Sequence, residues 1–253
     1  MMSVDPEAKS STVSATFTIS DEGFNCSFRV TVPAGPATLA DLLPIARSLS
    51  DAIVQATVTT VEQAGEKISC GNGCSACCNI LIAVSEVEAQ RISDLVQALP
   101  EPRKGVVLRR FSEARDQLER ASLLEPLQTP ERCTKADYAR LDDEYFRLGV
   151  PCPFLEQQSC SIYEERPLTC REHLVTSPPS LCAQLGSEGV RKVKLPFAVF
   201  NAMARVGIPS QGALSEKWVP LILAPEWAKT HTAPPEIKPG LELLQELLAH
   251  VNG

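Results

Sequence analysis

Aromatic side chains are scarce in this sequence. Phe, Trp and Tyr make up 5% of its 253 residues, too few to form the stacking platforms that hold single-stranded nucleic acids. Basic residues are also in the minority, because 24 Lys and Arg stand against 31 Asp and Glu, for a formal net charge of −7. Such a surface repels a phosphate backbone, so we expect no nucleic-acid partner.

The sequence has no long apolar run and no export signal. Its longest apolar stretches, 80–84 and 219–224, fall far short of the roughly 18 residues that a membrane-spanning helix needs. Residues 1–14 contain no basic segment followed by an apolar one, which is the mark of a signal peptide. We therefore expect no membrane partner and a cytoplasmic location, and any other partner is unknown. In the reducing cytosol, clustered cysteines favour metal or redox chemistry over disulfides.

Hydrophobic periodicity predicts a mainly α fold with a minor β element. Apolar residues alternate with polar ones over 13–19 and again over 26–32, with Asp21-Glu22-Gly23 between them, which indicates an N-terminal β-hairpin. Apolar residues at helical spacing predict helices near residues 38–65, 85–99, 107–121, 141–149, 197–206 and 241–251. Short strands are expected near residues 80–84 and 193–195.

Composition divides the chain into three segments. Residues 1–66 hold the β-hairpin and a helix, and residues 67–188 form a cysteine-cluster metal-binding domain with much irregular structure. Residues 189–253 form a C-terminal helical extension that we expect to pack on the same core. Helices and loops would then be organised around a cysteine-ligated metal centre.

Cysteine shows the clearest pattern in the chain. Eight of the ten cysteines form two clusters, Cys70-x3-Cys74-x2-Cys77-Cys78 and the more widely spaced Cys152, Cys160, Cys170 and Cys182. Thiolates are soft, charged ligands that suit zinc, iron–sulfur clusters and Cu(I), and short spacers let one loop direct several sulfurs inward. The alternative is a set of disulfides or buried free thiols. Cys26 and Cys133 lie outside both clusters, and we expect them to be ordinary thiols.

The adjacent Cys77 and Cys78 bear on the kind of metal centre. Neighbouring side chains point in different directions on a helix or strand, so both reach a single ion only from irregular backbone. A polynuclear centre, or two neighbouring centres, accepts adjacent thiolates more easily, which favours an iron–sulfur cluster. Zinc is the alternative, since eight thiolates also supply two tetrahedral sites.

At these residues the sequence resembles the YkgJ-type cysteine-cluster family, described as a zinc- or iron-chelating domain with a CxxCxxCC-like signature. The resemblance covers about residues 68–185 and includes Cys152-Pro153-Phe154-Leu155, Cys160-Ser161-Ile162-Tyr163 and Arg166-Pro167 leading to Cys170-Arg171. The first gap here has three residues rather than two, a departure that bears on which sulfurs share a metal. The resemblance implies a metal centre. A relative, the flagellin lysine-N-methylase, implies that methyl transfer is possible on such a cluster.

Polar residues near the clusters are candidates for cofactor binding. Arg166 and Arg171 flank Cys170, and guanidinium groups offset the negative charge of a thiolate-rich centre through hydrogen bonds. The alternative is a pair of surface arginines. His173 is a ligand, a hydrogen-bond donor or a solvated loop residue. The predicted metal ligands are Cys70, Cys74, Cys77, Cys78, Cys152, Cys160, Cys170 and Cys182.

Three functions are open from the sequence, which assigns no catalytic residue. The first is a metal-binding protein whose iron–sulfur or zinc centre is structural or serves redox or metal handling. The second is an iron–sulfur-dependent enzyme, such as a protein lysine N-methylase-like methyltransferase. Cys70-x3-Cys74-x2-Cys77 has the spacing of the radical S-adenosylmethionine signature, although the sequence lacks the repeated strand–helix units of that barrel. The third is a zinc-stabilised interaction module without chemistry.

Overall fold

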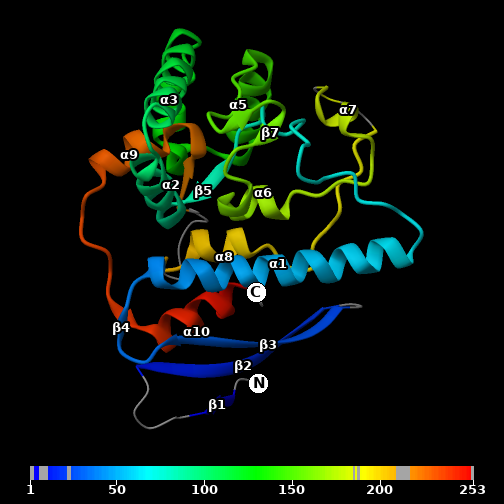
Figure 1. Cartoon of the computed structure of the whole chain (residues 1–253), viewed down its shortest axis with the longest axis vertical. Helices are drawn as coiled ribbons and strands as arrows, with labels where there is room; N and C mark the ends of the chain where they lie inside the picture. Colours follow the sequence, from blue (N-terminus) through cyan, green and yellow to red (C-terminus); the bar gives the residue numbers. More distant parts are fainter. Residues whose placement is uncertain are drawn as a thin grey trace. The chain divides into compact units, whose positions relative to one another are not determined.

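The computed structural model describes residues 3–5, 11–21, 24–184, 186, 189–208 and 217–251. The fold is mainly helical with a minor short-strand component, as the periodicity predicts (Figure 1). The strands are β1 (Ser3–Asp5), β2 (Thr12–Asp21), β3 (Phe24–Pro33), β4 (Pro36–Ala37), β5 (Ala83–Ser85), β6 (Leu155–Glu156), β7 (Ser159–Cys160), β8 (Trp218–Pro220) and β9 (Lys238–Pro239). The α-helices are α1 (Leu39–Gln63), α2 (Glu86–Ala98), α3 (Arg103–Arg120), α4 (Leu124–Gln128), α5 (Lys135–Leu148), α6 (Leu168–Glu172), α7 (Pro179–Cys182), α8 (Val199–Arg205), α9 (Ala224–Thr230) and α10 (Gly240–Val251).

Contacts between residues group the chain into two compact units. Unit 1 consists of Met1–Thr60, Lys194–Glu216 and Ala233–Gly253, and unit 2 consists of Val61–Val193 and Lys217–Thr232. Each unit is therefore built from segments that are distant in the sequence. The three-segment division made from composition stays a prediction.

The predicted N-terminal hairpin is confirmed in unit 1. β2 pairs with β3 in antiparallel register along its whole length, which places Phe17 opposite Phe28 with ring centroids 5.5 Å apart. Phe17 and Ile19 are buried, as one face of an alternating strand requires. The turn residues Glu22 and Gly23 lie outside the described residues. β1 pairs with the other edge of β2, so the sheet has the order β1-β2-β3.

The helix expected near residues 38–65 is α1. The Thr38 N–H and hydroxyl both donate to the Asp41 carboxylate, at 2.8 and 2.9 Å, so Asp41 caps the start of the helix as the acid of a capping box does. Gly65 follows the last turn with φ of +81°, a left-handed conformation that glycine adopts at low cost. The buried residues of α1 are Leu42, Leu43, Ala46, Leu49, Ser50, Ile53 and Thr57.

Helices α1, α8 and α10 lie on the same side of the three-stranded sheet (Figure 1). α10 packs against α8 and β3. Its first residue, Gly240, lies so close to the end of β3 that a Cβ there would stand 2.4 Å from the Pro33 carbonyl oxygen. This approach of helix to strand therefore depends on glycine. The buried residues of α10 are Gly240, Leu243, Leu244, Leu247, Leu248 and Val251.

Unit 2 contains the helices α2, α3, α5 and α9 around a hydrophobic core. A capping box of Ser85 and Glu88 begins α2, which packs against α9 and α3. One core cluster contains Val84, Ala89, Ile92, Val96, Val107, Phe111, Phe154, Ile162, Val219, Leu221 and Ala224. Cys152 and Cys160 pack against this cluster. Two cysteines of the second sequence cluster are therefore held by the core of the unit.

The two short strands expected outside the hairpin have different outcomes. The first is confirmed as β5, which is fully buried and pairs with β8 across a long stretch of sequence. The second is wrong, because residues 193–195, all of them described, form no strand. The backbone there pairs only at an isolated bridge between Val175 and Lys192, with the Val193 N–H donating to the Leu174 carbonyl at 2.9 Å.

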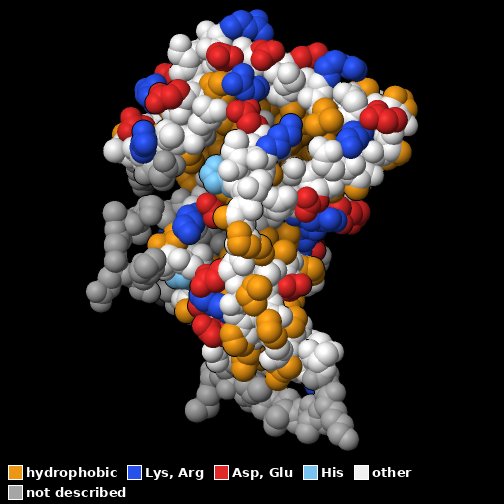
Figure 2. Space-filling view, turned by 90° about the vertical axis from the view of Figure 1, so that its left-hand side faces the viewer, with side chains coloured by type: hydrophobic (Ala, Val, Ile, Leu, Met, Phe, Trp, Pro, Cys, Tyr) orange, Lys and Arg blue, Asp and Glu red, His pale blue; other side chains and the backbone are white. Residues whose placement is uncertain are grey.

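Charged side chains of both signs are interspersed on the face drawn in Figure 2. Within unit 2, Arg115 on α3 pairs with Glu226 on α9 at 2.8 Å and with Glu119 at 3.0 Å. Mixed charges of this kind create no extended field of one sign. Among the described helices, none combines the length and the apolar character that crossing a membrane would require.

Candidate metal centre

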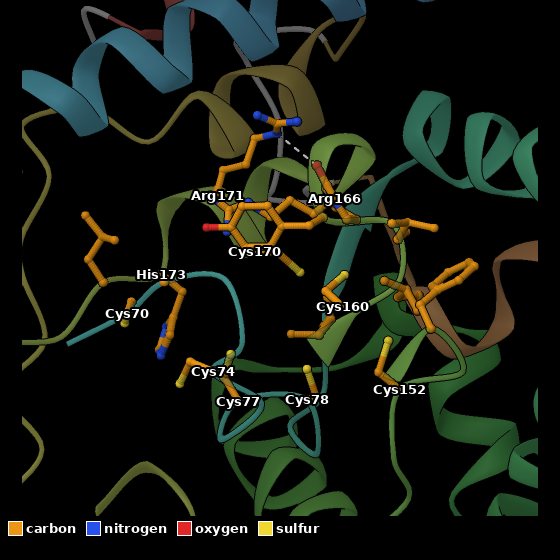
Figure 3. Close-up of a pocket in the computed structure, with 18 residues that line it drawn as sticks. Cys70, Cys74, Cys77, Cys78, Cys152, Cys160, Arg166, Cys170, Arg171 and His173 are labelled. Carbon is orange, nitrogen blue, oxygen red and sulfur yellow. Dashed lines mark hydrogen bonds between the residues drawn. The ribbon is translucent and has the colours of Figure 1, made fainter. Parts of the chain in front are cut away.

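Seven cysteines from both sequence clusters line one cavity of about 100 Å³ in unit 2 (Figure 3). They are Cys70, Cys74, Cys77, Cys78, Cys152, Cys160 and Cys170. The eighth predicted ligand, Cys182, ends α7 and is not among the residues that line the cavity. All ten cysteines are free thiols.

The two cysteines outside the clusters lie elsewhere. Cys26 is on β3 in unit 1. Cys133 packs against the core of unit 2 and its thiol donates to the Pro126 carbonyl at 3.7 Å. Neither thiol is among the residues that line the cavity, so both serve as natural controls for the clustered cysteines.

The loop of residues 70–78 folds as a series of tight turns. The Cys78 N–H donates to the Ser75 carbonyl at 2.9 Å, and Gly73 has φ of +90°, a conformation that strains any residue with a Cβ. Turns of this kind keep the backbone irregular. The adjacent Cys77 and Cys78 can therefore both face one cavity, which a regular helix or strand would prevent.

Cys152 and Cys160 are held beside this loop by backbone hydrogen bonds. The Cys152 N–H donates to the Cys78 carbonyl at 2.7 Å, which links the two sequence clusters directly. β6 and β7 form a tight hairpin that places Cys160 opposite Leu155, and the Leu155 N–H donates to the Cys152 carbonyl at 2.9 Å. One short, folded segment thus presents both thiols to the cavity.

The turn of the β6–β7 hairpin is also fastened to the 70–78 loop. Gln157 and Gln158 have φ of +49° and +62°, which is uncommon for residues other than glycine. The Ser75 hydroxyl donates to Gln158 Oε1 at 2.5 Å, and the Ser159 hydroxyl donates to Asn72 Oδ1 at 3.1 Å. These side-chain contacts join the 70–78 loop to the β6–β7 hairpin, the two segments that carry these cysteines.

Cys170 lies on α6, and a buried carboxylate positions this short helix. Glu88 is 1% exposed, and its Oε1 accepts a hydrogen bond of 2.7 Å from the Leu168 N–H at the start of α6. The other oxygen accepts the hydroxyl and the N–H of Ser85, at 2.9 and 3.1 Å. Sequence reasoning missed this role of Glu88. A Ser followed three residues later by a Glu is the pattern of a capping box, so the bonds between Ser85 and Glu88 can be predicted from the sequence. The bond to Leu168 cannot, because the two residues are far apart in the chain.

Cys70 is fixed by the segment that follows α6. The Val175 N–H donates to Cys70 Sγ at 3.3 Å, and the Ser69 N–H donates to the Val175 carbonyl at 2.9 Å. An N–H directed at sulfur favours the thiolate over the thiol. His173 lines the same cavity and lies near Cys70 and Cys74 in Figure 3. Burial, with a smaller contribution from Lys192, lowers the pKa of His173, which favours the neutral imidazole.

Five of the cavity thiols have a raised pKa, namely Cys70, Cys77, Cys152, Cys160 and Cys170. Burial raises the pKa of Cys152 to about 12 and raises the pKa of Cys70, Cys160 and Cys170. For Cys77 the leading cause of a raised pKa is its hydrogen bond with the Cys78 thiol, followed by burial. Repulsion among neighbouring thiolates adds to these shifts. A bound cation would reverse this balance, since metal replaces the thiol protons.

Arg166 lines the cavity and carries a positive charge close to Cys77 and Cys160. Its guanidinium stacks 4.0 Å above the Tyr163 ring, and its Nε is buried without a hydrogen-bond partner among the described residues. Burial raises the pKa of Cys160, and the charge of Arg166 counteracts that rise. The hydrogen bond with Cys78 and burial raise the pKa of Cys77, and the charge of Arg166 again counteracts that rise. An orphaned N–H beside thiols suits an anionic group in the cavity.

Arg171 also lines the cavity, but its guanidinium is engaged with the backbone. It is 7% exposed, its Nε donates to the Arg166 carbonyl at 2.9 Å, and a terminal nitrogen donates to the Glu164 carbonyl. Arg171 thereby holds the turn that carries Arg166 (Figure 3). Of the two arginines predicted to bind the cofactor, Arg166 has the free donor and Arg171 supports it.

The side chains that line the cavity are of the kind that binds a thiolate-ligated metal group, although no set of them is arranged around a single metal ion. Among the described His, Cys, Asp and Glu side chains, no three form a group that could hold one metal ion as they stand. The sulfurs instead surround a shared space, together with the orphaned N–H of Arg166. Soft sulfur donors and a compensating cation are what such a group requires.

The comparison with protein families agrees with this chemistry. Residues 69–185 match the family model CxxCxxCC, a putative zinc- or iron-chelating domain. The matched segment, which is less than half of the chain, is similar to this family. The matched residues include every clustered cysteine as well as Arg166 and His173. No curated protein and no solved structure matches the chain.

Proposed function

We propose that this protein binds an iron–sulfur centre through its clustered cysteines and that the centre serves a structural role or a role in electron or metal handling. The observation that supports the proposal is the convergence of thiols from both sequence clusters on one cavity. Buried free thiols that merely filled a core would pack among apolar neighbours. They would have no reason to gather around a shared space beside a guanidinium whose Nε has no hydrogen-bond partner among the described residues.

The spread of the sulfurs favours a polynuclear group over a single zinc ion. A structural zinc site gathers four donors tightly around one point. Among the described residues, not even three His, Cys, Asp or Glu side chains are grouped in that way. An iron–sulfur centre spans a larger space and accepts thiolates from several directions. Adjacent Cys77 and Cys78 both line the cavity, which also suits a centre with more than one metal atom.

The rest of the cavity wall suits such a centre. When bound, an iron–sulfur group supplies a one-electron redox couple and a covalent link between the limbs that carry its ligands. Ile82, Phe154, Ile162 and Leu221 give part of the cavity wall an apolar surface. Arg166 offsets negative charge, and the Val175 N–H donates to Cys70 Sγ at 3.3 Å. Hydrogen bonds to sulfur and solvent exclusion both tune the potential of such groups.

The test is metal and sulfide analysis of protein purified without oxygen. Iron together with acid-labile sulfide, and broad visible absorption that air destroys, is the expected result. Colourless protein with stoichiometric zinc and no sulfide, after expression with ample iron, would overturn the iron–sulfur assignment in favour of zinc. Protein with neither metal would overturn metal binding altogether.

A further inference from the structure

We infer that Arg103 and Arg110 of α3 position Cys152 and Cys160, so that α3 forms part of the metal site although it carries no cysteine. The inference rests on the proposed function and adds to it two positioning residues from outside both cysteine clusters. Neither arginine is among the described residues that line the cavity. Each therefore acts through the backbone beside a thiol rather than on the metal group itself.

Arg110 holds the backbone that follows Cys152. Its Nη1 donates to the Pro153 carbonyl at 3.0 Å and to the Leu155 carbonyl at 3.3 Å. Pro153 is the next residue after Cys152, and the Leu155 N–H donates to the Cys152 carbonyl at 2.9 Å. One guanidinium nitrogen thus joins two carbonyls of the turn that begins at Cys152, which fixes the conformation of the backbone that carries this thiol.

Arg103 holds the backbone that follows Cys160. Its Nη2 donates to the Ser161 carbonyl at 3.0 Å, and Ser161 is the next residue after Cys160. The Ser161 N–H donates to the Phe154 carbonyl at 2.9 Å. Both backbone polar groups of Ser161 are therefore engaged, so the chain cannot rotate freely at the point where it leaves Cys160.

One rigid helix carries both contacts. Arg103 and Arg110 are seven residues apart, which is two helical turns, so they share one face of α3 about 10 Å apart along the helix axis. The neighbouring Phe111 is buried and packs edge to face against the buried Phe154, with ring centroids 5.6 Å apart. This apolar contact holds α3 against the segment of residues 152–161, and the two arginines fix the backbone at both ends of that segment.

The carbonyl bonds, rather than an ion pair, carry this role. Glu156 Oε1 lies 3.7 Å from Arg103 Nε and 3.7 Å from Arg110 Nη1, and all three side chains are more than a third exposed. Exposed ion pairs of this kind contribute little to stability. A guanidinium suits the carbonyl role because its donors lie in a fixed plane and can reach several acceptors at once.

The experiment compares full-length variants purified without oxygen. Arg103→Met and Arg110→Met keep an apolar stem and remove the donors. Arg109→Met, at an exposed position of the same helix, is the matched control, and Glu156→Gln removes only the ion pair. Hydrogen exchange followed by mass spectrometry measures the protection of the amides in residues 153–161. Metal release to a chelator and the reduction potential report on the metal group.

We expect protection of residues 153–161 to fall about tenfold in each arginine variant. Metal release should be about tenfold faster and the reduction potential should shift, because residues that orient metal ligands control both properties. Arg109→Met and Glu156→Gln should match the natural protein in all three measurements. Arg110→Lys keeps the charge and a single donor group, so its values should lie between those of Arg110→Met and those of the natural protein.

Three results would overturn the inference. One is protection in both arginine variants equal to that of Arg109→Met. Another is lost protection with unchanged metal release and potential, which would limit α3 to a structural role. The third is a Glu156→Gln variant that reproduces the arginine variants, since the ion pair would then be the cause. If Arg110→Met does not fold, Arg110→Lys decides. Natural protein without metal would refute the proposed function, and amide exchange would still decide whether the arginines hold the segment.

Discussion

The carboxylate of Glu88 caps two helices at once: its Oε1 lies 2.7 Å from the backbone nitrogen of Leu168, while its Oε2 binds Ser85. The first contact starts α6 and the second starts α2. Because α6 carries Cys170, the side chain that begins one helix also sets the position of a predicted metal ligand. These hydrogen bonds come from backbone and hydroxyl groups, so Glu88 acts as a positioning residue for α6.

Replacing Glu88 should therefore destabilise the protein and weaken metal retention together. Glu88→Ala leaves three donors from Ser85 and Leu168 without their acceptor, and we expect a loss of about 2–4 kcal/mol in unfolding free energy. Urea unfolding measures the loss, and elemental analysis measures the metal. Glu86→Ala is the matched control, because Glu86 is exposed in the first turn of the same helix. Equal unfolding midpoints for the two variants would contradict the double cap.

Cysteine substitutions should separate the cavity thiols from the two remote ones. Cys70→Ser and Cys152→Ser each remove a cavity thiol, so metal content and melting temperature should both fall. Cys26→Ser and Cys133→Ser should keep the metal content of the natural protein, because those thiols lie on β3 and in the core of unit 2. Natural levels of metal and stability in both cavity variants would show that the clusters do not share a centre.

Arg166 should tune and retain the metal group. Arg166→Gln removes the positive charge beside Cys77 and Cys160, so we expect a lower reduction potential and metal affinity reduced about 10–100-fold. Arg166→Lys keeps the charge but loses the planar stack on Tyr163. Its reduction potential and metal affinity should therefore lie between those of the natural protein and those of Arg166→Gln. Spectroscopic redox titration measures the potential, with Arg109→Gln, an exposed position on α3, as the control. The same potential in Arg166→Gln and the control would exclude this role.

The cap of α5 should make stability depend on acid pH. The Thr134 hydroxyl and N–H donate to Asp137 Oδ2 at 2.7 and 3.0 Å, and these hydrogen bonds lower the pKa of Asp137. A carboxyl with a lowered pKa stabilises the folded state above its unfolded pKa of about 3.9, and the benefit disappears as the pH falls through the folded pKa.

The melting temperature of Asp137→Asn should accordingly lie below that of the natural protein at neutral pH. The difference should stay constant down to about pH 5 and close below about pH 4. In a Thr134→Val background, Asp137→Asn should have a smaller effect, because the hydroxyl donor is gone. A difference that persists unchanged into acid would refute the cap as its origin.

Two glycines near the end of β3 should respond oppositely to alanine. A Cβ at Gly240 would meet the Pro33 carbonyl oxygen at 2.4 Å, so Gly240→Ala should lower the unfolding free energy by about 1–3 kcal/mol. A Cβ at Gly35 would meet no atom within 4 Å, so Gly35→Ala should be neutral or slightly stabilising. Chemical unfolding of both variants makes the comparison. Equal stabilities would mean that α10 shifts freely away from β3.

The sequence by itself determined the elements whose signals are local. Alternation of apolar residues is enough for the β2–β3 hairpin, because each side chain reports its own face of the sheet. The helices predicted near residues 38–65 and 85–99 likewise begin within one residue of the observed starts of α1 and α2. The spacing of the clustered cysteines singled out the thiols that line the cavity, since few other roles require so many sulfurs so close together.

Only the tertiary structure decided which distant groups meet. The pairing of β5 with β8, the bond from Leu168 to Glu88 and the link from Cys152 to Cys78 join segments far apart in the chain. No local pattern encodes such contacts, because each depends on the packing of the whole unit rather than on the conformation of its own segment. For the same reason the sequence treated Arg166 and Arg171 alike. In the folded protein, Arg166 Nε is buried with no hydrogen-bond partner among the described residues, whereas the Arg171 guanidinium donates to backbone carbonyls.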